Sequence, residues 1–233
     1  MPHRILVWDL PTRLFHWLLV ALVVTAIITG KIGGGAIVWH GRIGVAIVGL
    51  LAFRIIWGFV GSSHSRFASF FPTPGKMVAY LRGHWRGPGH NPLGALSAFG
   101  LMALVALQVA SGLLANDDIA FQGYLSGLID KSLSDRLTGL HKLAFNALLV
   151  MIALHLAAIA FYAHVKKDNL VKPMITGWKE VEHHHPAPTG GGIGMLVLAL
   201  AVAGLAVYGA SGQWMPTPPQ PAVAPASPPA ANW

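Results

Sequence analysis

Hydrophobic and polar positions along this chain fall into long blocks. Five apolar blocks are each near the roughly 20 residues that a helix needs to cross a bilayer. They cover residues 14–30, 37–60, 93–115, 137–165 and 193–210. A bilayer offers backbone polar groups no outside partner, so each block is predicted to be a membrane-spanning helix. The first block is long for the apolar h-region of a signal peptide, it contains His16, and no A-x-A cleavage pattern follows it, so we expect it to be retained.

The polar segments between these blocks predict the domain organisation. Three glycines at 33–35 mark a turn, and proline-rich or charged loops occupy 61–92 and the residues after 115. We expect an all-α integral membrane fold, in which residues 1–180 form a four-helix bundle. A linker at 181–190 then leads to a fifth transmembrane helix at 191–211. The proline-rich tail, 212–233, is expected to be extended or disordered and external.

Composition supports a membrane protein and excludes several kinds of site. Hydrophobic residues make up 54% of the 233 residues and charged residues 10%, against about 25% charged in a typical soluble domain. Cysteine is absent, which excludes disulfides, iron–sulfur clusters and covalent c-type haem. The net charge is +8, but no basic stripe with interleaved aromatic residues indicates nucleic-acid binding.

The distribution of lysine and arginine predicts the orientation. Cytoplasmic loops of membrane proteins are enriched in these residues. One side carries ten of them, namely Arg4, Arg13, Arg66, Lys76, Arg82, Arg86, Lys166, Lys167, Lys172 and Lys179. The loops of the other side carry Lys31, Lys131 and Arg136 together with four aspartates. We therefore expect a bacterial inner-membrane protein with a cytoplasmic N-terminus and a periplasmic C-terminus.

Four histidines lie within or beside the predicted spans, where ionisable residues are costly and indicate function. His16 is expected near the cytoplasmic face, whereas His40 and His141 are expected near the external face. His155 follows His141 by 14 residues, which places both on one helix face about 21 Å apart. His155 should then lie at the level of His16. Two pairs result, His16 with His155 and His40 with His141.

Two facing imidazoles in a bundle interior can supply both axial ligands of a haem iron. Zinc fits less well, since only two histidines converge at each level and no acidic or thiolate ligand lies near. The four histidines therefore predict two haem sites, one toward each face of the membrane.

Three motifs that contain these histidines resemble the bacterial cytochrome b561 and nickel–iron hydrogenase b-type cytochrome family. They are T-R-L-F-H-W at 12–17, W-H-G-R-I-G at 39–44, and H-K-x12-H, which ends at His155. The resemblance covers about residues 5–180 and leaves out the fifth span and the tail. It implies a four-helix bundle that holds two non-covalent b haems by bis-histidine ligation. The inner haem iron would take His16 and His155, and the outer one His40 and His141.

Nearby basic residues are candidates for cofactor binding. Arg54 lies 14 residues after His40 and can pair with an inner haem propionate or a quinone oxygen. Alternatively, it is an interfacial arginine that snorkels, with its charged group extended to the membrane surface. Arg42 and Lys142 lie beside the outer ligands and Arg13 lies beside an inner one, so each can neutralise a propionate.

Other polar residues have plainer expected roles. Gln108 and Ser111 are expected to form interhelical hydrogen bonds. His64, His84 and His90 are expected to be solvated in the cytoplasmic loop, where one of them can serve as a proton donor near a quinone. The run His183–His185 resembles an adventitious metal-binding tract.

No catalytic nucleophile or acid–base pair is evident, and this favours one-electron transfer. The resemblance implies a carrier between the quinone pool and a periplasmic partner, either a c-type cytochrome or a dehydrogenase such as a hydrogenase. One alternative is a superoxide:quinone oxidoreductase, with Arg42, Lys142 and Lys131 steering the anion. Another is a haem-free transporter that uses the histidines for protons or metal.

Overall fold

The computed structural model describes residues 3–85, 87, 89–119, 121–181 and 188–216. The elements in chain order are β1 (His3–Leu6), α1 (Leu10–Ile32), α2 (Ala36–Val60), α3 (Phe67–Phe70), α4 (Pro74–Leu81), α5 (Pro92–Leu114), η1 (Ser126–Leu128), α6 (Lys131–His164), α7 (Val171–Thr176), β2 (Trp178–Val181) and α8 (Ile193–Ala210). Helices α1, α2, α5, α6 and α8 are long and apolar enough to cross a membrane. The five predicted spans are thus confirmed as helices, whereas the histidine run and the tail beyond 216 lie outside the described residues.

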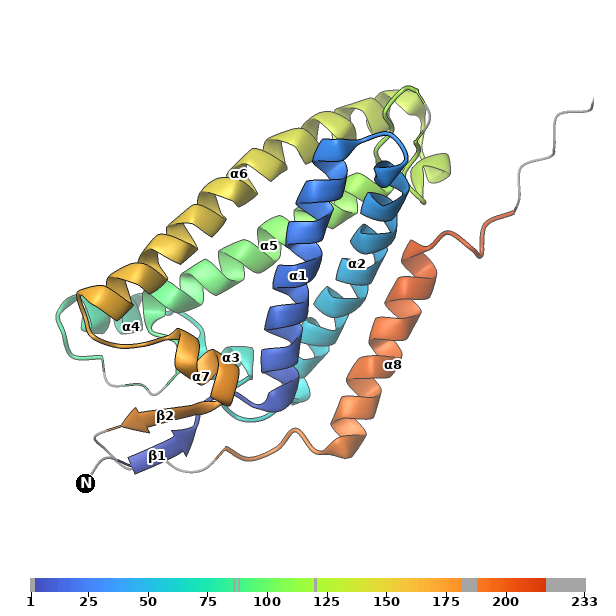
Figure 1. Ribbon diagram of the computed structural model, residues 1–233. Helices are drawn as coiled ribbons and strands as arrows, with labels where there is room; N and C mark the ends of the chain where they lie inside the picture. The colour runs from blue at the N-terminus through green and yellow to red at the C-terminus, as the bar shows by residue number, and fades with distance from the viewer. Residues whose placement is uncertain (1–2, 86, 88, 120, 182–187, 217–233) are drawn as a thin grey trace, which may run out of the picture.

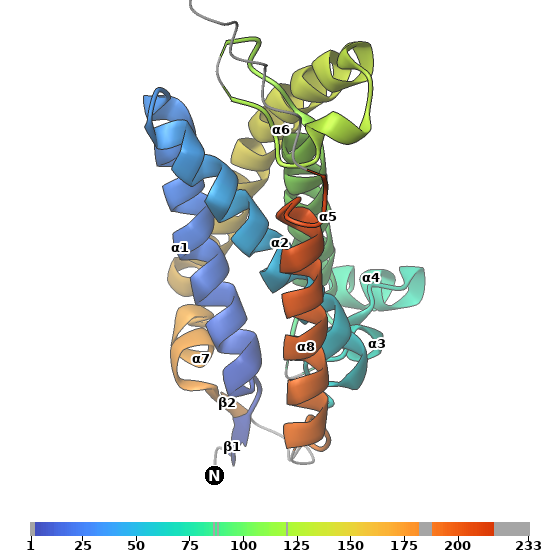
Figure 2. The same ribbon diagram turned by 90° about the vertical axis from the view of Figure 1, so that its right-hand side faces the viewer.

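Four of these helices form the bundle and the fifth lies beside it. Helix α1 packs along α2, α5 packs along α6, and α2 joins the two pairs by packing on α5 (Figure 1). Helix α8 lies against α2 (Figure 2). A Cβ at Gly49 would lie 2.6 Å from Val207 Cγ2, so the glycine permits this close approach.

Side-chain caps set the starts of three spanning helices. Asp9, Asn91 and Asp130 each accept a hydrogen bond from the backbone N–H three residues on, at the first turns of α1, α5 and α6. Such caps satisfy N–H groups that have no partner within the helix. The cap at Asp130 starts α6 at Lys131, ahead of the predicted 137, because the first turns are polar and hydropathy does not detect them.

The short elements other than η1 gather at the end of the bundle that holds the N-terminus (Figure 1). Strands β1 and β2 pair antiparallel there, with Leu6 opposite Trp178, and tie the N-terminus to the segment after α7. The loop 115–130 closes the opposite end. Hydropathy did not predict this two-stranded sheet, since each strand is four residues long and its partner is remote in sequence.

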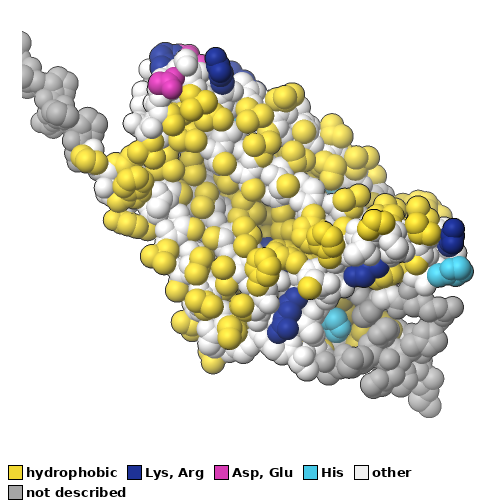
Figure 3. All heavy atoms as spheres, turned by 180° about the vertical axis from the view of Figure 1, so that it is seen from behind, with side chains coloured by type: hydrophobic (Ala, Val, Ile, Leu, Met, Phe, Trp, Pro, Cys, Tyr) yellow, Lys and Arg dark blue, Asp and Glu magenta, His cyan; other side chains and the backbone are white. Residues whose placement is uncertain are grey.

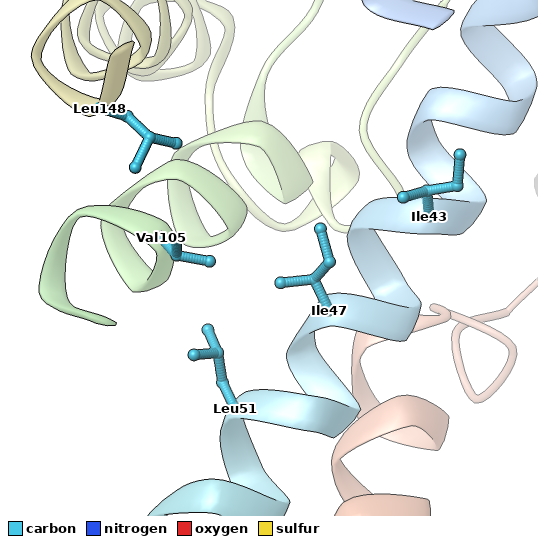
Figure 4. Close-up of a cluster of buried hydrophobic side chains, with 5 residues drawn as sticks. All are labelled: Ile43, Ile47, Leu51, Val105 and Leu148. Atoms are coloured by element: carbon cyan, nitrogen blue, oxygen red, sulfur yellow. The ribbon is translucent and has the colours of Figure 1, made fainter. Parts of the chain in front are cut away.

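An apolar core fills the middle of the bundle. Ile43, Ile47 and Leu51 of α2 face Val105 of α5 and Leu148 of α6 (Figure 4). Outside, apolar side chains cover most of one broad face, and charged side chains gather mainly toward its ends (Figure 3). The buried core therefore occupies the stretch between the two histidine levels.

Candidate functional site

A cavity of about 520 Å³ opens between α1, α2, α5 and α6 near the end closed by the loop 115–130. It lies within the range of about 300–1,000 Å³ found for small-molecule and cofactor sites. Its lining is mainly apolar, and Ile47, Val105 and Leu148 of the central core belong to it. His40 and His141 both face this cavity.

The two imidazoles face each other from α2 and α6. Their ring centroids are 6.1 Å apart and their planes cross at 85°. Two imidazoles bound to opposite sides of one metal ion through bonds of about 2 Å have centroids about 6 Å apart. The spacing therefore suits two axial ligands of a single metal.

Backbone carbonyls of the neighbouring helices orient both rings. His40 Nδ1 donates to the carbonyl oxygen of Ala26 at 2.8 Å, and His141 Nδ1 donates to that of Gln108 at 2.9 Å. A carbonyl can only accept, so each Nδ1 carries the proton and each Nε2 keeps its lone pair. Metal-binding histidines are commonly fixed in this way.

A glycine lies beneath each ring, four residues after the accepting carbonyl. A Cβ at Gly30 would lie 2.9 Å from His40 Nδ1, and a Cβ at Gly112 would lie 2.8 Å from His141 Cε1. Gly44 also lines the cavity, but a Cβ there would meet nothing within 4 Å. The first two glycines leave room for the imidazoles, and the third leaves open space for a flat ligand.

Gln108 and Ser111 form the interhelical contacts expected of them. Gln108 Nε2 lies 2.9 Å from His141 Nε2, and Ser111 Oγ lies 3.3 Å from His141 Nδ1. The Gln108 amide thus donates to the lone pair that a metal would use. Metal binding at His141 requires this amide to turn away.

The basic residues at this end differ in their placement. Lys31 and Lys142 line the cavity, and Lys31 also lies over the Phe145 ring. Arg42 is exposed and stacks on Trp39 at 5.0 Å. Lys131 forms salt bridges with Asp118 and Asp135, which neutralise its charge locally. Lys31 was missed as a candidate because it lies nine residues before His40 in the sequence. It lines the same cavity because the turn between α1 and α2 folds the end of α1 back beside the start of α2.

The second histidine pair lies toward the other end. His16 of α1 and His155 of α6 are both partly buried and close enough for a charge on one to act on the other. His16 Nδ1 is buried and has no hydrogen-bond partner among the described residues. The structure thus brings His40 and His141 together and leaves His16 and His155 within range of each other's charge, whereas haem binding by each pair stays a prediction. His164 is exposed, as expected from its place on the helix.

Two further groups belong to this inner region. Arg54 is 5% exposed, so its charged group does not extend to the membrane surface as that of a snorkelling arginine would. His90 was expected in solvent, but its ring packs on Trp8 and Phe70 at centroid distances of 4.6 and 4.8 Å. The expected solvation of His90 is therefore wrong, because its loop folds back onto Trp8, between β1 and α1, and onto α3, whereas His84 is indeed exposed.

Arg13 and Asp9 hold the inner end together. Arg13 donates to the carbonyl oxygen of Ile175, which fixes α7 to α1. Asp9 Oδ2 accepts hydrogen bonds from three side chains, Trp57 at 3.0 Å, Ser62 at 2.6 Å and Ser65 at 2.9 Å. Burial alone would raise the pKa of Asp9, but hydrogen bonds led by that of Ser62 outweigh burial and lower this pKa below 3.8.

The residues at both levels fit bis-histidine haem ligation. The outer level offers a cavity, two histidine rings whose Nε2 atoms carry lone pairs, and an open surface over Gly44. The inner level offers two neighbouring histidines and buried donor atoms on His16 and Arg54 that lack acceptors among the described residues. No cluster of three or more histidine, aspartate or glutamate side chains suited to a metal ion occurs in the described part of the chain.

Comparison with known proteins agrees with this geometry. The chain is 25% identical over 226 aligned positions to a probable Ni/Fe-hydrogenase B-type cytochrome subunit of Azotobacter chroococcum mcd 1, and 77% of this chain and 90% of that protein are covered. The namesake from Azotobacter vinelandii gives the same values. That from Bradyrhizobium diazoefficiens is 24% identical, with 75% of this chain and 85% of the relative covered. No solved structure matches the chain.

A family model described as prokaryotic cytochrome b561 matches residues 7–177. The match runs from the end of the first strand through α7 and contains all four histidines, while α8 lies outside it. Multi-pass membrane helices, b-type haem and electron transport are properties of this family. The chain belongs to the prokaryotic cytochrome b561 family.

Proposed function

We propose that this b-type cytochrome carries electrons across the bacterial inner membrane through two haem b groups, between the quinone pool and a periplasmic hydrogenase. The outer haem would be held by His40 and His141, and the inner one by His16 and His155. The observation that carries the proposal is the 6.1 Å separation of the His40 and His141 rings across a cavity of cofactor size.

Each part of the chain has a distinct task in this account. Bound haem supplies one-electron chemistry. The histidines hold it, and the carbonyls of Ala26 and Gln108 orient the outer pair. The apolar core around Ile47, Val105 and Leu148 keeps water from the space between the two levels. Lys31 and Lys142 place positive charge at the outer cavity, where propionates would be neutralised.

The hydrogenase partner is proposed from the relatives, which are named as Ni/Fe-hydrogenase cytochrome subunits. The orientation is proposed from the basic loops, which belong to the end that holds the N-terminus. Residues 1–180 would form the haem-binding unit, with 181–190 a linker to α8. Helix α8 would anchor or dock beside α2 without contacting haem.

Transmembrane transfer can be tested in proteoliposomes that contain trapped ferricyanide. Dithionite added outside should reduce the ferricyanide in liposomes with wild-type protein and not in protein-free liposomes. The His141→Ala and His16→Ala variants, each lacking one haem, should lose most of this rate. A variant without one haem that transfers electrons at the wild-type rate would rule out a two-haem path.

The partner can be tested in membranes of the host organism. The hydrogenase assignment predicts that hydrogen gas reduces the b-type absorption band of this cytochrome. The band should stay oxidised under hydrogen when the hydrogenase is deleted. Reduction by a periplasmic c-type cytochrome, with no response to hydrogen, would instead assign that protein as the partner.

A further inference from the structure

Arg54 and His90 each carry a buried nitrogen at the inner end without a hydrogen-bond partner among the described residues. Arg54 lies in α2 with 5% of its surface exposed, and its Nη1 atom is buried without a hydrogen-bond partner among the described residues. His90, from the loop before α5, has a buried Nδ1 atom in the same condition. Both side chains pack on the ring of Phe70, the guanidinium at 6.0 Å and the imidazole at 4.8 Å.

Aromatic contacts compensate the buried charge of Arg54 only in part. Its guanidinium lies 4.6 Å from the centroid of Phe67 and 6.0 Å from that of Phe15. Cation–π contacts offset only part of the cost of burying an unpaired ion. A buried arginine in this position therefore calls for an anion.

The carboxylate of this chain that acts on Arg54 is Asp9, and other donors already occupy it. Its Oδ1 accepts from the backbone N–H of Thr12, and its Oδ2 accepts from Trp57, Ser62 and Ser65. None of the salt bridges in the described part of the chain involves Arg54. Because the described residues supply no salt-bridge partner to Arg54, an anion carried by a bound ligand would fill this place.

This site lies at the same end of the bundle as the inner histidine pair, close enough for charges on that pair to act on His90. Burial first, and then the positive charges that Arg54, His155 and His16 can carry, lower the pKa of His90 to about 4. His90 is therefore neutral at pH 7 and donates one ring N–H without adding charge. The guanidinium of Arg54 also lies 6.0 Å from the ring of Phe15, the residue before His16 on α1, so an acceptor oxygen bound by Arg54 would lie near the level of the inner histidine pair.

We propose that Arg54 and His90 together bind a carboxylate, the propionate of the haem held by His16 and His155. This inference rests on the proposed function and adds the group that anchors the inner haem at its polar edge. Hydrogen bonds between a guanidinium and a carboxylate are among the strongest in proteins. A quinone carbonyl can accept the same hydrogen bonds, but it is neutral and cannot balance the charge of Arg54.

The test measures haem content and the midpoint potentials of both haems in Arg54→Gln, Arg54→Lys and His90→Gln. The outer haem serves as an internal reference, and the inner one is assigned with His141→Ala protein. Arg82→Gln, which removes an exposed arginine from the same end, is the matched control. Positive charge near a haem favours its reduced form, so removing Arg54 should lower the inner potential.

In Arg54→Gln we expect either loss of the inner haem with the outer one retained, or a shift of its reduced-to-oxidised ratio by tenfold or more, which is about 59 mV. Because lysine keeps the positive charge, Arg54→Lys should shift the inner midpoint potential much less than Arg54→Gln does. His90→Gln should also give a smaller shift than Arg54→Gln, and Arg82→Gln should give none. An unchanged inner potential and haem content in Arg54→Gln would overturn the proposal. The proposal would also be overturned if Arg54→Gln lost its reaction with quinol while both haem potentials stayed unchanged, since Arg54 would then bind quinone.

If Arg54→Gln does not insert, His90→Gln decides, and an unchanged inner potential and haem content in His90→Gln overturn the proposal. Wild-type protein without two haems would instead contradict the proposed function itself.

Discussion

The Nδ1 atom of His141 lies 2.9 Å from the carbonyl oxygen of Gln108 on the neighbouring helix. His40 repeats this arrangement with Ala26 on the other side of the cavity. In both cases a glycine follows the accepting residue by four positions, one helical turn, and lies beneath the ring. Each imidazole is therefore held by a backbone carbonyl, which side-chain substitutions leave in place. Each imidazole also needs the space over a glycine, which a substitution of that glycine would fill.

The first prediction concerns Gly112. A Cβ there would lie 2.8 Å from His141 Cε1, so Gly112→Ala should push the ring off the Gln108 carbonyl. Overpacking of this kind costs about 1–3 kcal/mol, and each 1.4 kcal/mol or so is tenfold in affinity. We expect outer-haem affinity to fall about tenfold or more, measured by haem titration of the apoprotein.

Gly139→Ala is the control for Gly112→Ala. Gly139 lies two residues before His141 on the same helix, but a Cβ there would meet nothing within 4 Å. The control should bind haem like the wild type. Equal affinities for the Gly112→Ala and wild-type proteins would show that the glycine does not position the ligand.

The second prediction concerns charge at the outer cavity. Lys31 lines the cavity, whereas Arg42 is exposed and stacked on Trp39. Lys31→Gln should therefore lower the midpoint potential of the outer haem more than Arg42→Gln does, although both remove one positive charge. Spectroelectrochemical titration measures both values. A larger effect at Arg42 would place the propionates on the other side of α2.

The helices and the histidine pairs were predictable from the sequence, and the surroundings of the histidines were not. Apolar runs reveal spans because lipid imposes one chemistry along about 20 residues. The 14-residue spacing of His141 and His155 follows from helix geometry alone. By contrast, the burial of His90 depends on how its loop meets Trp8, 82 residues earlier in the chain.

Helix ends and interhelical contacts show the same division. The cap at Asp130 extends α6 into polar sequence that hydropathy does not assign to the span. The fit of His141 over Gly112 requires α5 and α6 to be in register, which no local pattern encodes. The sequence shows Gly30 and Gly112 late in two spans, but no pattern in it connects either glycine with a particular imidazole ring.

The third prediction concerns Asp9, which caps α1 and accepts from three buried side chains. Asp9→Ala should lose about 1 kcal/mol for the cap and about 1–3 kcal/mol for each buried donor left without a partner. Asp9→Asn keeps one acceptor oxygen and should lose less. The midpoint temperature of unfolding in detergent, followed by circular dichroism, should be highest for the wild type, lower for Asp9→Asn and lowest for Asp9→Ala.

The same carboxylate predicts a pH dependence. The folded-state pKa of Asp9 is lowered below 3.8, so its contribution to stability is complete above that value. It is lost as the pH falls through the folded-state pKa. The stability difference between wild type and Asp9→Asn should therefore be constant from pH 7 to about pH 5 and shrink in stronger acid. A difference that grows on acidification would contradict the lowered pKa.

The most direct test of the two-haem account is a pyridine haemochrome assay, with a reduced-minus-oxidised spectrum, on detergent-purified wild type, His141→Ala and His155→Ala. The account predicts two b haems per chain in the wild type and one in each variant, with different haems lost because the two histidines serve different pairs. Two substitutions that remove the same haem would contradict the pairing. A wild-type protein that inserts and folds without haem would contradict electron transfer itself and assign the histidines to transport.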